Sequence, residues 1–303
     1  MNYIGINGTL VPAAQAMVSV MDHGFLYGMG LFETFRTYSG VPFLFKEHLD
    51  RLRDGCRTVG IRAELDEAGI MALIRELMAA NGLQDAYIRY TLTAGEAPFG
   101  LPSEPYGHPA EVVYVRPLPQ PAADLYTRGK ALYVLSTPRN TPETPVRLKS
   151  LHYMNNIMAK QELMELERRF GSQANPEGLA SEGLLLTRDG ELAEGIVSNL
   201  FIVSEGQLHT PSIDRGILPG ITRSKVIELA KAAGVKVIQG RFGRELLTSA
   251  DEIFLTSSIQ ELTPVTKVIR PNGSFFVIGS GTAGPLTLKL LHSYRNLTGG
   301  YSK

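Results

Sequence analysis

The stretch VRLKSLHYMNN, residues 146–156, holds Lys149, the one lysine between Lys130 and Lys160. Arg147 is the only other residue of the stretch that is charged at neutral pH. A lysine on a solvated surface usually lies among other charges, so this pattern indicates a lysine in a pocket. Desolvation there would lower the pKa of the amine and make it a nucleophile or a base.

The composition sets wider limits on what the chain does. Its 303 residues, 44% hydrophobic and 20% charged, are typical of a globular protein with two domains. Thirty basic and thirty acidic residues balance, which argues against nucleic acid or an anionic membrane as a partner. One cysteine, Cys56, excludes an internal disulfide. No signal peptide or membrane-spanning stretch is expected, so we predict a cytoplasmic protein.

The first part of the chain predicts a hairpin turning at Asn7-Gly8, two amphipathic helices and two further strands. They are expected at residues 3–11, 45–60, 66–82, 86–95 and 110–117. The proline-rich stretch RPLPQPAADLY then predicts a linker. The predicted division is a first domain at 1–118, a linker at 119–127 and a second domain at 128–303.

The second part alternates strands and helices. Strands are expected at 130–136, 235–240 and 251–258, with two strand pairs between 182 and 210. Helices are expected at 153–169, at 222–234 with Thr222 as N-cap, and at 285–294. Because hairpins are frequent among the helices, the pattern predicts an α+β protein with mixed sheets. The stretch YGMGLF lacks the spacing of a dinucleotide fingerprint.

Three further signals follow Lys149 and suggest a cofactor. Glu194, in ELAEGIVSNLF, precedes a glycine and a buried strand. The loop GILPGITRSKV opens a helix at Ile221 and Thr222, where backbone N–H groups favour a phosphate. In DEIFLTSSIQE a strand runs into the hydroxyls of Ser257 and Ser258. Taken alone, Glu194 is more often a surface turn carboxylate, the loop at Thr222 is as often an ordinary N-cap, and the two serines are also compatible with a polar strand end. Together, a lysine, a carboxylate and two phosphate-binding turns are what pyridoxal phosphate requires, and no metal site is predicted.

The motifs resemble those of one known family over nearly the whole chain. They are DHGFLYGMGLFETFR, FKEHLDRL, RLKSLHYMNN, AEGIVSNLF, PSIDRGILPGITR and DEIFLTSSIQELTPV. The chain is identified as a member of the class IV, or fold-type IV, pyridoxal phosphate aminotransferase-like proteins. It is most similar to the bacterial 4-amino-4-deoxychorismate lyases of folate biosynthesis. Branched-chain and D-amino-acid aminotransferases are the related alternatives.

This resemblance implies a two-domain α+β homodimer with a smaller N-terminal α/β domain. The larger C-terminal domain is expected to contain mixed, barrel-like sheets. The resemblance also assigns roles: Lys149 forms the Schiff base, Glu194 faces the pyridine nitrogen, Arg51 reaches the phosphate, and Tyr153 lies near the phenolic oxygen. The phosphate-binding turns are assigned to Ile221, Thr222, Ser257 and Ser258. His23 and Tyr27 are candidates to line the substrate pocket.

The shared cofactor leaves the reaction open, because the substrate wall decides it. D-amino-acid aminotransferases carry an arginine and a histidine in a loop that here reads TAGEAPFGLPSE, with Phe99 and Leu101 near those positions. Branched-chain enzymes carry a tyrosine and an arginine two residues apart, a spacing that Tyr87 and Arg89 match. The motifs around residues 22–36 and Lys149 favour the lyase, which releases pyruvate and needs no keto acid. Arg89 is the candidate contact for a substrate carboxylate.

Overall fold

The fold is seen in a computed structural model, which describes residues 1–298. The described chain forms two compact units. The first comprises Met1–Gln120 and Leu148–His152, and the second comprises Pro121–Arg147 and Tyr153–Leu297. The segment around Lys149 therefore belongs to the first unit, although the sequence-based division places it in the second domain. The boundaries predicted at 118 and 128 remain a proposal.

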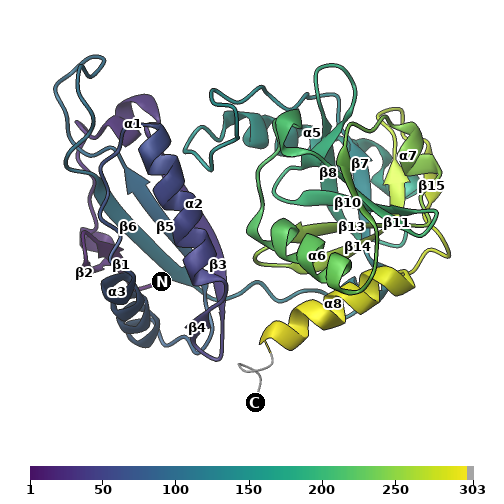
Figure 1. The fold of residues 1–303 in the computed structure, drawn as a ribbon, viewed down its shortest axis with the longest axis horizontal. Coiled ribbons are helices and arrows are strands. Elements are labelled where there is room, and N and C mark those ends of the chain that lie inside the picture. The colour runs from purple at the N-terminus through teal and green to yellow at the C-terminus, as the bar shows by residue number, and fades with distance from the viewer. Residues whose placement is uncertain (299–303) are drawn as a thin grey trace. The chain divides into compact units, whose positions relative to one another are not determined.

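The first unit is built on a six-stranded sheet in the order β2-β1-β6-β5-β3-β4, with antiparallel neighbours (Figure 1). Its strands are β1 (Tyr3–Ile6), β2 (Thr9–Pro12), β3 (Gly30–Tyr38), β4 (Val41–Pro42), β5 (Tyr87–Thr93) and β6 (Ala110–Arg116). The predicted hairpin at Asn7-Gly8 is confirmed. Both residues adopt positive φ angles, 47° and 75°, as a tight two-residue turn requires.

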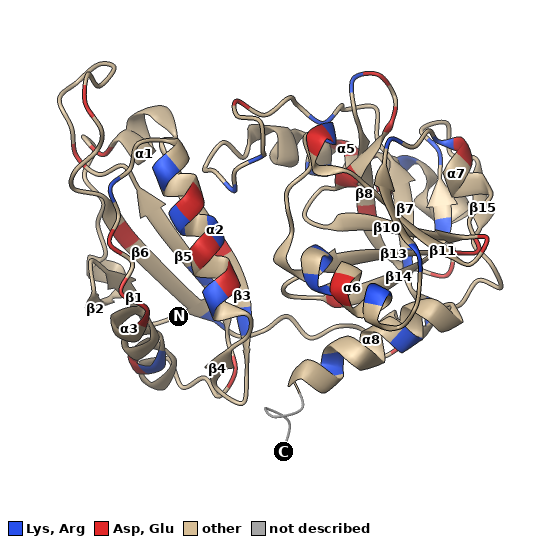
Figure 2. Ribbon diagram, viewed as in Figure 1, with Lys and Arg blue, Asp and Glu red and all other residues tan. Residues whose placement is uncertain are grey.

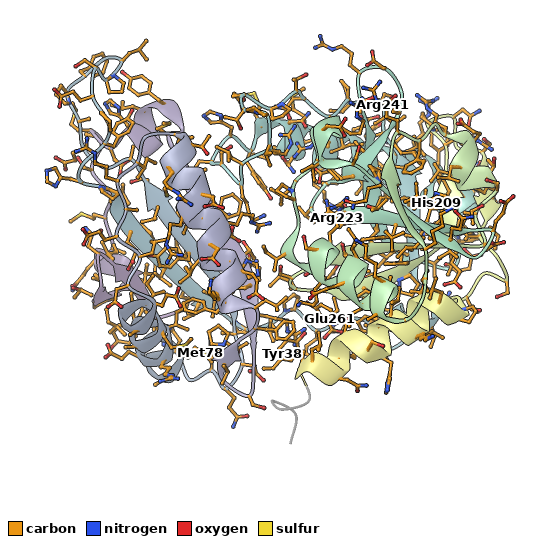
Figure 3. All side chains as sticks on the ribbon, viewed as in Figure 1. Tyr38, Met78, His209, Arg223, Arg241 and Glu261 are labelled. Carbon is orange, nitrogen blue, oxygen red and sulfur yellow. The ribbon has the colours of Figure 1, made fainter. Side chains whose placement is uncertain are left out.

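Two helices pack on one face of this sheet. The helical elements are η1 (Ala13–Gln15), α1 (His23–Tyr27), α2 (Phe45–Thr58) and α3 (Glu67–Ala80). Asp66 caps α3 by accepting from the N–H groups of Ala68 and Gly69. Leu49 of α2 and Leu77 of α3 are fully buried in the core beside the sheet. Figure 2 shows acidic and basic residues along α2, whose apolar residues face the core. Met78, labelled in Figure 3, is among the buried residues of α3.

The second unit contains a closed barrel. Six of its strands form the circuit β7-β8-β9-β10-β13-β14, which the pairing of Glu194 with Asn199 completes. Strand β7 runs parallel to both β8 and β14, and the other steps are antiparallel. The strands of this unit are β7 (Lys130–Val134), β8 (Ala180–Leu186), β9 (Leu192–Gly195), β10 (Asn199–Ser204), β11 (Gln207–Pro211), β12 (Val237–Gly240), β13 (Glu252–Ser257), β14 (Glu261–Ile269) and β15 (Phe275–Val277). The prediction of mixed, barrel-like sheets is confirmed.

Helices cover the outside of the barrel, and apolar side chains fill its interior. The helical elements are α4 (Leu125–Arg128), α5 (Met154–Ala174), η2 (Ile213–Arg215), α6 (Ile221–Ala232), α7 (Glu245–Thr248) and α8 (Pro285–Thr298). Leu132, Leu200 and Leu255 lie in the interior cluster, whereas Leu163 of α5 and Tyr133 of β7 belong to a second cluster on the outside. Burying one such side chain contributes about 1.5–3 kcal/mol. Figure 1 shows α6 and α8 on one side of this unit.

Several helix boundaries differ from their predictions. Helices α5 and α8 end at Ala174 and Thr298, beyond the predicted residues 169 and 294, and the start of α6 also differs. The N-cap of α6 is Gly220, and Thr222 lies inside the first turn instead of capping it. A threonine near a helix start is a weak boundary signal, because its hydroxyl serves other roles as well. None of the helices in the described part of the chain combines the length and apolar composition that a membrane crossing requires.

Candidate active site

Lys149 is held against the edge of β3 in the first unit. The N–H of Phe32 donates to the carbonyl of Lys149 at 2.9 Å, and the N–H of Leu151 donates to the carbonyl of Gly30 at 3.0 Å. A Cβ at residue 30 would lie 2.7 Å from the carbonyl oxygen of Leu92, a backbone atom that cannot move aside, so this position requires glycine. The Lys149 Nζ lies 4.7 Å from the centroid of the buried Phe32 ring. The amine therefore has an apolar aromatic wall on one side.

Arg89 of β5 contacts the same ring. Its guanidinium carbon lies 3.6 Å from the centroid of Phe32, the geometry of a cation–π contact. In the register of β3 and β5, Arg89 pairs with Thr34, which points to the same face as Phe32. The structure therefore brings Lys149 and the candidate substrate residue Arg89 to one aromatic side chain.

Arg51 of α2 forms a buried cluster with Glu33 and His48. Its Nε and Nη2 donate to the two carboxylate oxygens of Glu33 at 2.7 and 2.6 Å, and the Nδ1 of His48 lies 2.6 Å from the same carboxylate. Burial by itself would raise the pKa of Glu33, but Arg51 and His48 outweigh it and lower the pKa to about 2. Burial lowers the pKa of His48 despite the carboxylate beside it. Arg51 is thus a fixed cation, which is what a phosphate contact requires.

The cluster predicts a specific acid sensitivity. Because the pKa of Glu33 falls from 4.5 to about 2 on folding, its contribution is fully present above pH 4.5 and is lost as the pH falls toward 2. The full contribution is on the order of 3 kcal/mol. Glu33→Gln should therefore unfold more easily in urea at pH 7, and this difference from wild type should shrink by about 2 kcal/mol between pH 5 and pH 3.

The matched control is Glu47→Gln, which changes an exposed carboxylate on α2, the helix that carries Arg51 and His48. It should unfold like wild type at each pH. A Glu33→Gln variant whose stability difference from wild type is the same at pH 5 and pH 3 would contradict the assignment of this low pKa.

Tyr27 and His23 hold the loop that follows β5. The hydroxyl of Tyr27 accepts from the N–H of Gly100 at 3.1 Å, and the His23 Nε2 lies 3.1 Å from the carbonyl of Pro98. The carbonyl only accepts, so His23 donates there and its Nδ1 faces the hydroxyl of Tyr106 at 3.0 Å. His23 is fully buried, so it supports the loop from beneath, whereas Tyr27 is 39% exposed. Tyr27 also lines a cavity of about 520 Å³ in the first unit.

Glu194 lies in the second unit with most of its acceptor capacity used. Its Oε1 accepts from the Nε of Arg139 at 2.8 Å. Its Oε2 accepts from the Nδ2 of Asn199 at 3.1 Å and from the N–H of Leu218 at 3.0 Å. A carboxylate offers about four acceptor positions, so roughly one remains on Oε1. That position fits a single protonated ring nitrogen.

The two turns predicted for the phosphate lie side by side. The hydroxyl of Thr222, in the first turn of α6, lies 3.5 Å from that of Ser258 and 3.4 Å from that of Tyr294. Ile221 begins α6, and no side chain caps this helix end. Backbone N–H groups of a first turn have no partner inside the helix, so Ile221 and Thr222 supply donors suited to an anion. The turn after β13 is fixed by the N–H of Gln260, which donates to the Ser257 hydroxyl at 3.1 Å.

The surroundings of these turns add positive charge. Arg223, labelled in Figure 3, is 3% exposed in the first turn of α6 and bonds to Thr210, Pro211 and Gln239, all neutral groups. Burial lowers its pKa to about 10, so it keeps its charge at neutral pH. A buried guanidinium bonded to neutral partners favours an anion at the nearby helix end.

Sequence reasoning missed three residues of this site. Arg139 and Asn199 bind Glu194 directly, yet Arg139 lies 55 positions away along the chain. Thr256 pairs with Asn199 across β10 and β13, and its buried hydroxyl has no hydrogen-bond partner among residues 1–298. A buried hydroxyl without a partner in a polar site calls for a bound group. Asn199 and Thr256 lie inside the motifs quoted for Glu194 and Ser257, so their positions could have suggested them. Arg139 had no such signal, because only the fold brings it to Glu194.

The remaining predicted residue, Tyr153, stands at the N-cap of α5 in the second unit, four residues after Lys149. Taken together, the donor set of the second unit fits pyridoxal phosphate: an acceptor for the ring nitrogen, adjacent phosphate turns and an unpartnered hydroxyl. Within residues 1–298, no three or more histidine, cysteine, aspartate and glutamate side chains gather to hold a metal ion.

Comparison with known proteins agrees with this donor set. The sequence profile of the amino-transferase class IV family matches residues 30–268. Aminodeoxychorismate lyase of Bacillus subtilis (strain 168) is 39% identical over 271 residues, which cover 89% of this chain and 87% of that protein. A putative branched-chain-amino-acid aminotransferase of Methanocaldococcus jannaschii is 36% identical over 294 residues, which cover 97% of this chain and 96% of that protein.

A solved structure gives the same likeness in three dimensions. The branched-chain amino acid aminotransferase of T.th., solved with pyridoxamine 5'-phosphate, superimposes with a TM-score of 0.81 and 30% identity. The match covers 99% of this chain and 95% of that one. The similar proteins are named for two different reactions, so the likeness identifies the fold and the cofactor and leaves the reaction open.

Proposed function

Since the chain belongs to the amino-transferase class IV family, a family of pyridoxal phosphate enzymes, we propose that it is a 4-amino-4-deoxychorismate lyase. It would release pyruvate and leave p-aminobenzoate, a precursor in folate biosynthesis. The observation that carries this choice is the identity with an aminodeoxychorismate lyase over most of both chains.

The proposed chemistry uses Lys149 and Glu194. When bound, pyridoxal phosphate supplies an aldehyde for an amine and a ring that accepts electrons from the adjacent carbon. Lys149 would hold the cofactor through its side-chain amine. Its Nζ would also accept the proton from the amine-bearing carbon of the substrate. Glu194 would accept a hydrogen bond from the ring nitrogen and favour its protonated form, in which the ring is an effective electron acceptor. Loss of pyruvate leaves an aromatic ring, and this makes the release effectively irreversible.

The phosphate would be held by Arg51 together with the two turns of the second unit. A phosphate dianion needs several donors, and charge-assisted bonds are the strong ones. Ile221 and Thr222 would offer backbone and hydroxyl donors at the start of α6. Ser257 and Ser258 would offer those of the second turn, and Tyr153 would lie near the phenolic oxygen of the ring. The fixed orientation of Arg51 against Glu33 supports this role.

The substrate end is proposed to involve Arg89 and Tyr27. Arg89 already packs on the ring that Lys149 contacts, so a carboxylate bound to Arg89 would lie close to the reactive amine. The loop held by Tyr27 presents apolar Phe99, 78% exposed, and Leu101, 91% exposed. An apolar loop suits a cyclic substrate and lacks the basic pair expected for D-amino acids.

A branched-chain aminotransferase is the second candidate, and a specific observation favours it. Tyr87 and Arg89 lie two residues apart on β5, so both point to the face that carries Phe32. That spacing is the one expected of branched-chain enzymes. A transaminase differs from the lyase in needing a keto acid as a second substrate.

We also propose a cytoplasmic homodimer. Both units expose large apolar side chains that lie in groups along the sequence, as is typical of an interaction surface. In the first unit these groups include Met17, Val18, Val20, Met21, Phe25, Phe99 and Leu101, and on α5 of the second unit they include Met154, Ile157, Met158 and Met164. A second copy of the chain would cover such side chains. Cys56 is buried and free, as a reducing compartment allows.

The reaction itself is testable with one assay. Purified protein given 4-amino-4-deoxychorismate without any keto acid should produce p-aminobenzoate, followed by its fluorescence, in many turnovers for each cofactor. Lys149→Ala serves as the matched blank for uncatalysed breakdown. No product, combined with fast transfer of the amine from a branched-chain amino acid to 2-oxoglutarate, would replace the lyase with the transaminase.

A further inference from the structure

Arg139 is the one charged side chain that bonds directly to Glu194 in the described structure. Its Nε donates to Oε1 at 2.8 Å, and the two side chains are only 7% and 5% exposed. A buried carboxylate without a cation would gain free energy by taking up a proton, because burial disfavours the charged form. Arg139 therefore stabilises Glu194 as an anion.

The opposite side of Arg139 is held by two adjacent asparagines at the start of α5. The Oδ1 of Asn155 accepts from its Nη1 at 2.9 Å, and the Oδ1 of Asn156 lies 3.4 Å away. Each asparagine donates its amide nitrogen to a backbone carbonyl, that of Pro138 or Ile196. Those bonds fix the amide orientations, so both oxygens must face the guanidinium. The two asparagines of the motif HYMNN therefore orient the guanidinium of Arg139.

The other charges near Glu194 contribute without direct contact. Arg147 bonds to the carbonyls of Gly216 and Asn140, and it shares the Asn140 Oδ1 with Arg139. Burial, and the charge of Arg139 beside it, lower the pKa of Arg147 to about 10. Arg223 acts on Glu194 through its charge alone. Neither residue donates a hydrogen bond to the carboxylate, so its orientation depends on Arg139, Asn199 and Leu218.

We propose that Arg139, anchored by Asn155 and Asn156, is a positioning residue that keeps Glu194 ionised and aimed, so that the proton between Glu194 and the cofactor stays on the ring nitrogen. This rests on the proposed role of Glu194. A proton shared by a carboxylate and a pyridine nitrogen moves toward the nitrogen when a cation stabilises the carboxylate. Without Arg139 the proton would shift to Glu194, and the ring would become a weaker electron acceptor.

The test uses the holoenzyme loaded with cofactor labelled with ¹⁵N at the ring nitrogen. Wild type should give the signal of a protonated ring nitrogen at pH 7. Arg139→Gln should shift the ¹⁵N signal toward that of an unprotonated ring nitrogen. Arg139→Lys keeps the charge, so its signal should lie between those of wild type and Arg139→Gln. Asn155→Ala should move it less, in the same direction. Arg188→Gln, which changes an exposed arginine of the same unit, should leave the signal unchanged.

A binding measurement gives a second readout. The protein should prefer pyridoxal phosphate over its analogue with carbon in place of the ring nitrogen, and Arg139→Gln should reduce that preference about tenfold. A protonated signal in folded Arg139→Gln, or an unchanged preference, would overturn the inference. If Arg139→Gln does not fold, a ¹⁵N signal in Asn155→Ala that is unchanged from wild type would also overturn the inference. Wild type that fails to bind the cofactor, or whose ring nitrogen is unprotonated, would instead contradict the proposed role of Glu194.

Discussion

Replacing Lys149 with alanine is expected to lower turnover by at least about 10³-fold, because the variant loses both the proposed covalent attachment and the proposed base for the substrate proton. The fold should survive the change. The segment is held to β3 by backbone hydrogen bonds, and these do not depend on the lysine side chain. The purified variant should still bind the cofactor through the proposed phosphate contacts, but only reversibly.

The attachment can be mapped directly. Borohydride treatment of wild type should fix the cofactor on a peptide that contains Lys149, and the same treatment of Lys149→Ala should fix none. Lys160→Ala is the matched control, since Lys160 is the next lysine along the chain and is exposed on α5. It should be labelled and should turn over like wild type. Label recovered on another lysine in wild type would refute the assignment.

Glu194→Gln is expected to have the second largest effect, about 10²–10³-fold in turnover, as for other preorganised charged groups at reacting centres. Glutamine keeps the shape of glutamate but has only one acceptor oxygen. In the structure both carboxylate oxygens receive donors, Oε1 from Arg139 and Oε2 from Asn199 and Leu218. The new amide nitrogen must therefore face a donor, which should also destabilise the fold by about 1–3 kcal/mol.

These two losses can be separated by measuring turnover per bound cofactor alongside urea unfolding. Glu191→Gln is the matched control on the same stretch, because Glu191 pairs with Arg215 instead of facing the site. It should turn over like wild type. Near-normal turnover per bound cofactor in Glu194→Gln would remove Glu194 from the mechanism, whatever its effect on stability.

Local patterns of the sequence were sufficient for the elements whose causes are local. The turn at Asn7-Gly8 follows from two residues that tolerate positive φ, and α2 and α3 follow from their helical apolar stripes. The prediction of Thr222 as the N-cap of α6 was wrong, because its hydroxyl contacts the hydroxyl of Ser258 and Gly220 is the N-cap. Barrel closure also needs the parallel pairings of β7 with β8 and β14, which join segments far apart in the sequence and which no periodicity encodes.

The same distinction applies to the site. The lysine and the phosphate turns lie in short motifs, so the sequence could suggest them. Arg51 was assigned to the phosphate, but its anchoring by Glu33, 18 residues earlier on β3, appears only in the structure. The contact of Arg139 with Glu194 spans 55 positions and depends on the order of strands around the barrel. Side-chain networks of this kind are set by tertiary packing, and a single sequence does not specify them locally.

The segment Leu148–His152 limits how the coding sequence of such a protein can be divided or recombined. The chain leaves the second unit at Arg147, lies along β3 of the first unit, and returns to the second unit at Tyr153. The two units are therefore not modules that recombination could exchange at a single join. A gene divided between Gln120 and Pro121 would encode Lys149 in one polypeptide and β3, the strand that holds it, in the other.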